Sequence, residues 1–299
     1  MKKFLLVVAL GLAVLLCISM TILAGEKETR FSFRTVIFPD DTFTQLLGIN
    51  DFEVIAGYHG ANVNKGFIFT FPHNFTPENF PNSAQTQVIG INNEGHTDGF
   101  YIDTAGTTHG FLDINGTFTT VDFDATTFNQ LLGVNNFDQA AGYYMDAAGI
   151  FHPYIFDNNG KVFLLIIIPL PTGGTASAQA TGINDRGSIS GFYIDNAGKN
   201  HGFLLAKGRF FTLDFPGATL TQAFGLNNED DVVGAYMDTA GLTHGFIFDD
   251  GFFQSVDDPE GVGSTTINGI NDRGQLVGFF VDAAGNTDGL VATPHHERE

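Results

Sequence analysis

The chain has 299 residues, of which 33 are acidic and 13 basic, so its formal net charge is −20. A surface of this charge repels phosphate backbones and anionic lipid headgroups, which argues against nucleic acid or a membrane surface as a partner. With 32 phenylalanines, 37 glycines, no tryptophan and only 15% charged residues, the composition favours an all-β chain with an aromatic core.

The N-terminus resembles an export signal. Two lysines precede an apolar run from residue 4 to residue 24, which predicts a secretory signal peptide ending at Ala24 or, as the alternative, an uncleaved membrane anchor. We therefore expect a secreted, extracellular or periplasmic protein. The single cysteine, Cys17, lies inside this run, so neither disulfides nor a thiolate metal site are expected in the exported chain. Residues 25–30 are polar and read as a lead-in.

The main part of the chain is built on one repeated pattern, which is clearest at residues 182–203 (GINDRGSISGFYIDNAGKNHGF). Residues 184–187 have turn chemistry, because Asn and Asp bond nearby backbone amides and Gly accepts a positive φ. Residues 188–195 alternate as a half-buried strand does. A second turn at 195–198 leads to a strand at 201–205, and a fourth segment follows at 208–216. Each unit thus predicts four antiparallel strands.

Six copies of this unit follow one another at spacings of 42 to 49 residues. The first glycine of the pattern falls at Gly48, Gly90, Gly133, Gly182, Gly225 and Gly269. A second glycine follows nine residues later in every copy, at Gly57, Gly99, Gly142, Gly191, Gly234 and Gly278. The constant offset indicates a rigid first hairpin. The longest spacing comes from residues 165–178, which read as an inserted loop with binding potential.

Six four-stranded units of this length predict a six-bladed β-propeller that occupies residues 31–293 as a single domain, followed by a polar tail at 294–299. The last unit stops after its third strand at residues 289–292. Residues 33–39, which precede the first unit, resemble the fourth strand of the other units. We therefore expect the N-terminal strand to close the last blade, with the strand that ends in Gly-Ile-Asn innermost. An open β-solenoid is the alternative.

The His-Gly-Phe segments at His109, His201 and His244, with the Gly-Ile-Asn and Tyr-x-Asp-x-Ala-Gly blocks before them, resemble the HAF-type extracellular repeat family of bacterial secreted proteins. The resemblance covers residues 31–293. The family is named after a His-Ala-Phe motif, and this chain has Gly in place of the Ala. It implies an extracellular repeat protein and carries no assigned reaction.

Carboxylates and imidazoles recur at one end of each unit. The second strand ends at Asp103, Asp146, Asp195, Asp238 or Asp282, and a histidine begins the third strand six residues after the first four of these. Such groups are metal ligands in other proteins. Their recurrence favours a structural role instead, in which Asp accepts turn amides and His pairs across the hairpin. The turns lack the alternating oxygen ligands of a calcium loop, so no metal or cofactor is expected.

Two units break the pattern at the histidine position. The first carries Lys65 there and the sixth carries Asp288. Because the first and sixth blades of a closed ring are neighbours, these residues are candidates for a charged ligand subsite, with His109, His201 and His244 as further candidates. The alternative is that terminal repeats are atypical because they form the closure.

No nucleophile elbow, catalytic triad order, zinc pattern or phosphate loop stands out. The sequence therefore favours an exported, non-enzymatic propeller that binds a protein or a carbohydrate through exposed Phe and Tyr on its loops. A secreted hydrolase or lyase acting on glycans or lactones is the alternative by analogy of fold alone. A purely structural module is a third.

Overall fold

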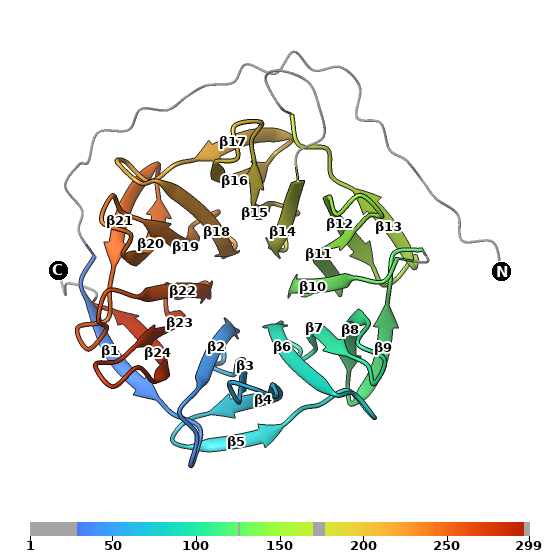
Figure 1. Cartoon of the computed structure of the whole chain (residues 1–299), viewed down its shortest axis with the longest axis horizontal. Coiled ribbons are helices and arrows are strands. Elements are labelled where there is room, and N and C mark those ends of the chain that lie inside the picture. The colour runs from blue at the N-terminus through green and yellow to red at the C-terminus, as the bar shows by residue number, and fades with distance from the viewer. Residues whose placement is uncertain (1–28, 125, 170–176, 296–299) are drawn as a thin grey trace.

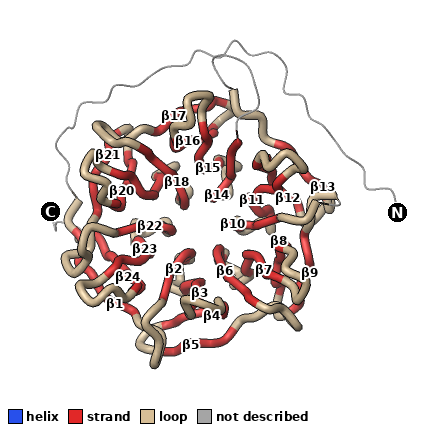
Figure 2. Tube along the Cα trace, viewed as in Figure 1, coloured by secondary structure: helices blue, strands red, loops and turns tan. Residues whose placement is uncertain are grey.

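The computed structural model describes residues 29–124, 126–169 and 177–295. These residues form six four-stranded antiparallel sheets arranged as blades around a central axis (Figure 1). The described residues contain strands and loops without a helix (Figure 2), and thus no helix that could span a bilayer. The predicted signal peptide, the centre of the inserted loop and most of the polar tail lie outside the described residues. The six-bladed propeller is confirmed, and the solenoid is excluded.

The blades are numbered in chain order. Blade 1 contains β2 (Thr44–Ile49), β3 (Ile55–His59), β4 (Lys65–Thr70) and β5 (Asn74–Pro77). Blade 2 contains β6 (Gln85–Ile91), β7 (Thr97–Ile102), β8 (Thr108–Ile114) and β9 (Thr117–Val121). Blade 3 contains β10 (Asn129–Val134), β11 (Gln139–Met145), β12 (Phe151–Asp157) and β13 (Val162–Leu165).

The second half of the ring follows the same order. Blade 4 contains β14 (Ser177–Ile183), β15 (Ile189–Ile194), β16 (Asn200–Ala206) and β17 (Arg209–Leu213). Blade 5 contains β18 (Leu220–Leu226), β19 (Val232–Met237), β20 (Thr243–Asp249) and β21 (Phe252–Val256). Blade 6 contains β22 (Thr265–Ile270), β23 (Leu276–Val281), β24 (Thr287–Pro294) and, from the other end of the chain, β1 (Phe31–Val36).

The ring is closed by the two ends of the chain. Strand β1 pairs antiparallel with β24, with Thr35 opposite Leu290 and Val36 opposite Gly289, and it lies at the outer edge of blade 6 (Figure 1). Its last residue, Val36, packs with Leu46 of blade 1 in one hydrophobic cluster. The predicted closure is therefore confirmed. Pairing the terminal strands leaves no gap in the ring at which a blade would expose its face.

The innermost strand of every blade carries a β-bulge at the first glycine of the repeat pattern, which is Gly48 in blade 1. The register shifts between Leu46 and Gly48 in blade 1, and at the matching positions of the other five blades. A bulge leaves one residue unpaired and turns its side chain aside. That residue, Leu47 in blade 1, lines the axial channel, and so do its counterparts. The bulges therefore decide which side chains face the axis.

Candidate functional site

The axial channel is divided by the first glycines into two compartments. A Cβ atom on Gly133 would lie 3.1 Å from the Gly182 Cα atom of the next blade, and one on Gly225 would lie 2.6 Å from the Asn268 carbonyl oxygen. Backbones approach too closely here for any side chain. The innermost strands begin in the compartment on one side of this waist and end in the compartment on the other.

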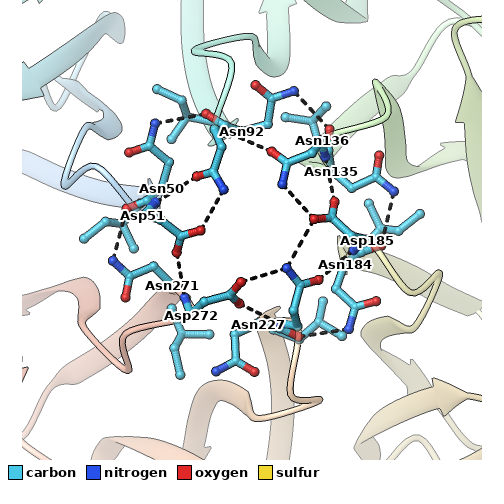
Figure 3. Close-up of a pocket in the computed structure, with 18 residues that line it drawn as sticks. Asn50, Asp51, Asn92, Asn135, Asn136, Asn184, Asp185, Asn227, Asn271 and Asp272 are labelled. Atoms are coloured by element: carbon cyan, nitrogen blue, oxygen red, sulfur yellow. Dashed lines mark hydrogen bonds between the residues drawn. The ribbon is translucent and has the colours of Figure 1, made fainter.

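The compartment where the innermost strands end is lined by two rings of Asn and Asp (Figure 3). In the first ring, Asn184 accepts the turn amides of Arg186 and Ser188 through Oδ1 and donates through Nδ2 to the Asn227 carbonyl of the next blade. Five of the six blades make this inter-blade bond at 2.9 to 3.1 Å. In blade 5 the Asn227 amide turns instead to Asp231.

The second ring is closed through all six blades. The backbone N–H of each residue donates to the side-chain Oδ1 of its counterpart in the next blade, at 2.8 to 2.9 Å. The members are Asp51, Asn93, Asn136, Asp185, Asn228 and Asp272. These polar groups are partnered by one another around a hollow of about 70 Å³. The arrangement is that of a structural lock, which holds the blades in register.

Two phenylalanines stand out at this end of the axis. Phe52 and Phe137 are 68% and 58% exposed, and each follows the ring residues in the turn of its blade. They are the clearest match to the aromatic loops that the sequence led us to expect as binding residues.

The compartment where the innermost strands begin is an open cavity of about 350 Å³. Five glutamines project into it, one from each of blades 1 to 5, and they are Gln45, Gln87, Gln130, Gln179 and Gln222. Aromatic rings from the second strands complete the wall together with the bulge residues, and among them are Tyr58, Phe100 and Phe192. Every described residue that lines this cavity is uncharged.

The second glycine of the repeat pattern, nine residues after the first, supports the wall of this cavity in every blade. A Cβ atom on Gly191 would lie 2.1 Å from the Gln179 carbonyl oxygen, and the same contact recurs in the other blades at 1.9 to 2.3 Å. Only glycine lets the second strand approach the first this closely. These six glycines therefore have the structural role assigned to them from the sequence, and they fix the backbone from which each glutamine, or Thr266 in blade 6, projects.

The glutamine ring was missed in the sequence, although its signal was present. Glutamine stands three residues before the first glycine in five of the six units. Its meaning depends on the innermost strand facing an open channel, and on the bulge that follows it.

The aspartates predicted at the end of the second strand brace their own hairpins. Asp195 Oδ1 accepts the amides of Ala197 and Lys199, both at 2.8 Å. The hydrogen bond from Lys199 lowers the pKa of Asp195 below its usual value, as the equivalent amide does for Asp103 and Asp238. In Asp146 the hydrogen bond from His152 is the largest cause of the lowered pKa.

The histidines that begin the third strands are held on both ring nitrogens in three blades. His201 Nε2 lies 3.3 Å from Asp195 and Nδ1 lies 2.8 Å from Asp214 of the outermost strand. The ring also stacks on Tyr193 at 5.1 Å between centroids. His109 and His244 are held in the same way, and His152 pairs with its hairpin aspartate alone. These groups already bond one another, as expected of bracing residues.

The structure does not bring Lys65 and Asp288 together. The Lys65 Nζ atom lies 3.4 Å from the Ala84 carbonyl oxygen, on the side of blade 2. Asp288 is 7% exposed, and its pKa is raised by burial and by the neighbouring Asp282, Glu260 and Asp258. The two residues form no ion pair, so a shared charged subsite is not supported. Within the described residues, no group of three His, Cys, Asp or Glu side chains is placed to hold a metal ion.

Two carboxyls at the interfaces between blade 2 and its neighbouring blades were also missed by sequence reasoning. Glu78 stands where Val36 stands at the end of β1, and it bonds the Thr97 hydroxyl across the blade interface. Burial, with a smaller contribution from nearby Asp113, raises the pKa of Glu78 to about 7. Asp98, fully buried beside the Gly90 amide, also has a pKa raised by burial to about 7. Comparison of equivalent repeat positions would have found both residues.

No protein-family model matches the chain, and no curated protein matches it in sequence. Solved structures match its fold. A gluconolactonase from Xanthomonas campestris aligns with a TM-score of 0.53 at 10% identity, over 91% of this chain and 96% of that one. The β-propeller domain of the Trilobed protease from Pyrococcus furiosus gives 0.52 at 12% identity, over 85% and 98%.

A mutant of AofleA from Arthrobotrys oligospora gives a TM-score of 0.50 at 13% identity, over 91% of this chain and 88% of that one. At such identities these likenesses show the propeller fold alone.

Proposed function

We propose that this protein is an exported, non-enzymatic propeller of the HAF type, which binds a neutral carbohydrate in the cavity lined by the five glutamines. The observation that carries this proposal is the chemistry of the wall. Carboxamides both donate and accept hydrogen bonds, as sugar hydroxyls do. The aromatic rings beside them offer apolar surface to the C–H face of a sugar. A net charge of −20 disfavours acidic sugars.

The hydrolase alternative has less support at this site. General acid–base catalysis of glycoside or lactone cleavage uses titratable side chains beside the scissile bond. The described residues that line the cavity are Gln, Asn, Thr, Tyr and apolar side chains. The only titratable group among them is Tyr58, whose pKa is raised by burial to about 12. The cavity is therefore suited to holding a ligand unchanged.

The proposal is tested by calorimetric titration of the purified protein with the methyl glycosides of glucose, mannose, galactose and fucose, and with glucuronate as the charged control. We expect at least one neutral glycoside to bind with a dissociation constant of about 1 mM or tighter, and glucuronate to bind more weakly. In Leu132→Trp we expect the indole to occupy the cavity that Leu132 lines and to abolish binding. Leu165→Trp, on an outermost strand, is the matched control and should bind as the wild type does.

Absence of binding by every neutral glycoside would contradict the proposal. So would binding that survives in the Leu132→Trp variant, because the sugar would then occupy another surface.

A further inference from the structure

The glutamine cavity has two unlike halves, although its ring is built from one repeat. In blades 1 to 3 the carboxamides are engaged by other protein groups. Gln45 Oε1 accepts the Tyr58 hydroxyl at 2.6 Å, and Gln130 accepts the Tyr143 hydroxyl in the same way. Gln87, whose blade has Phe instead of Tyr at this position, donates to Asn64 at 2.7 Å.

The carboxamides of blades 4 and 5 are free. Gln179 and Gln222 are half-buried, and their side chains have no hydrogen-bond partner among the described residues. The reason lies in the neighbouring second strand, which carries Phe192 in blade 4 and Ala235 in blade 5 in place of a tyrosine. Neither residue can bond the glutamine. Each carboxamide therefore keeps its two donors and its acceptor available to a ligand.

Blade 6 adds a second kind of free polar group on the same side. Asn268 occupies the bulge position, where blades 1 to 3 carry Leu47, Ile89 and Leu132. Its Oδ1 atom is buried and has no hydrogen-bond partner. An unpaired buried acceptor destabilises the folded state, and an apolar residue at the same place in three other blades shows that the fold does not require asparagine there. The residue is thus better explained by a ligand than by folding.

Aromatic surface lies on this side as well. Phe192 of blade 4 and Phe224 of blade 5 pack edge to face, with centroids 6.2 Å apart and planes at 90°. Both line the cavity. The volume of about 350 Å³ is near the lower end of the range for small-ligand pockets, roughly 300–1,000 Å³, which suits one or two sugar rings better than a longer chain.

We infer that the cavity holds a single neutral pyranose, free or at the end of a glycan, from one side. Gln179, Gln222 and Asn268 bond the hydroxyls along one edge of the ring, and the Phe192–Phe224 pair contacts its apolar face. The half of the wall in blades 1 to 3 shapes the cavity and adds little binding energy. This inference rests on the proposed carbohydrate-binding function.

The test compares matched glutamines by calorimetric titration with whichever of the four methyl glycosides binds the wild type most tightly. One hydrogen bond of ordinary strength corresponds to about a 5-fold change in affinity. We expect Gln179→Ala and Gln222→Ala each to weaken binding by about 5-fold. Gln45→Ala and Gln130→Ala are the controls and should weaken it by less than about 2-fold.

Asn268→Leu is tested by two measurements, glycoside affinity and melting temperature. Together they distinguish a ligand-binding role of Asn268 from a purely structural one. We expect it to weaken glycoside binding by about 5-fold and at the same time to raise the melting temperature, because it removes the unpaired buried acceptor. A lower melting temperature with unchanged affinity would assign Asn268 to the fold.

Failure of the inference can be told apart from failure of the function. If a glycoside binds and Leu132→Trp abolishes binding, but the blade 1 and blade 3 glutamines matter as much as Gln179 and Gln222 or more, the one-sided site is wrong and the carbohydrate cavity stands. If no neutral glycoside binds, both are wrong.

Discussion

The two ends of the axial channel are lined by similar side chains and have opposite characters. At one end, Asn and Asp from all six blades bond one another and the turn amides, so little bonding capacity is left over. At the other end, the carboxamides of Gln179 and Gln222 and the Oδ1 atom of Asn268 have no partner among the described residues. A polar ring in a propeller is therefore not by itself a binding site; the partners its groups already have decide its role.

The same contrast applies to the outer hairpins. Their Asp and His residues look chemically richer than glutamine, yet each is held by its neighbours, as His201 is held between Asp195 and Asp214. The Oδ1 atom of Asn268 is the stronger indication of a ligand, because it is buried without a partner and buried polar groups in folded proteins are normally satisfied.

The largest effect is expected where the wall of the cavity depends on close backbone approach. In Gly191→Ala the new Cβ atom would lie 2.1 Å from the Gln179 carbonyl oxygen, so β14 and β15 must separate. We expect a loss of about 3 kcal/mol or more in the free energy of unfolding, measured by urea denaturation. Gly160→Ala is the control, because its Cβ would meet only the Val162 side chain, at 3.2 Å from the Cγ2 atom, and no backbone atom. A loss for Gly191→Ala no larger than for the control would show that the approach is not tight.

The next effect separates the two rings directly. Asn184→Ala removes a side chain that accepts two turn amides and donates to the next blade. Because these partners are buried, the expected loss in the free energy of unfolding is about 2–3 kcal/mol. Gln179→Ala removes a side chain without a partner, and its effect should lie within about 0.5 kcal/mol. Equal losses in the two variants would remove the distinction between the lock and the open ring.

Protonation gives a third test, at a polar site that belongs to neither ring. The pKa of Glu78 is raised to about 7 in the folded state, so the folded state binds this proton more tightly than the unfolded state does. Stability from Glu78 is then fully present below its unfolded pKa of about 4.5, and it is lost as pH rises toward about 7. The loss is on the order of 3 kcal/mol.

Glu78→Gln keeps a neutral hydrogen-bonding group and isolates this contribution from that of Asp98. We expect the variant to match the wild type at about pH 4 and to be more stable than it at about pH 8, as judged by urea midpoints. The same difference at both pH values would contradict a raised pKa for Glu78.

The smallest effect concerns an exposed ion pair outside the Asn and Asp rings. Arg186 and Glu229 lie 2.9 Å apart, and their side chains are 49% and 68% exposed. Solvent screening leaves such a pair worth less than about 1 kcal/mol. Arg186→Ala should therefore shift the free energy of unfolding by about 0.5 kcal/mol or less, and added salt should erase the shift. A loss comparable to that of Asn184→Ala would contradict this expectation, because the exposed ion pair would then stabilise the protein as much as the buried Asn side chain does.

The fold could be predicted in detail because the same turn and strand signals recur in all six repeats. The blade and its innermost strand were predicted from the constant nine-residue offset between glycines and from the Asn-led turns. The closure between residues 33–39 and 289–292 was predicted from the incomplete last unit. The role of the Asp and His hairpins was also open to prediction, since turn amides and cross-strand partners follow from local spacing.

The cavity was harder to predict for physical reasons. Gln45 and Gln222 are the same residue at the same repeat position, and only their neighbours, Tyr58 in one blade and Ala235 in the other, decide which is engaged. The link from Gln87 to Asn64 crosses between blades. Such contacts depend on how neighbouring blades pack in space, and this packing cannot be inferred from the repeat pattern alone.

A crystal structure of the protein with the tightest-binding methyl glycoside would show where on the propeller the sugar binds. We expect the sugar on the axis, in the glutamine cavity, with hydroxyl oxygens about 3 Å from the side chains of Gln179, Gln222 and Asn268. A sugar found instead at Phe52 and Phe137 beside the Asn ring, or at the Asp and His hairpins on the rim, would contradict this placement.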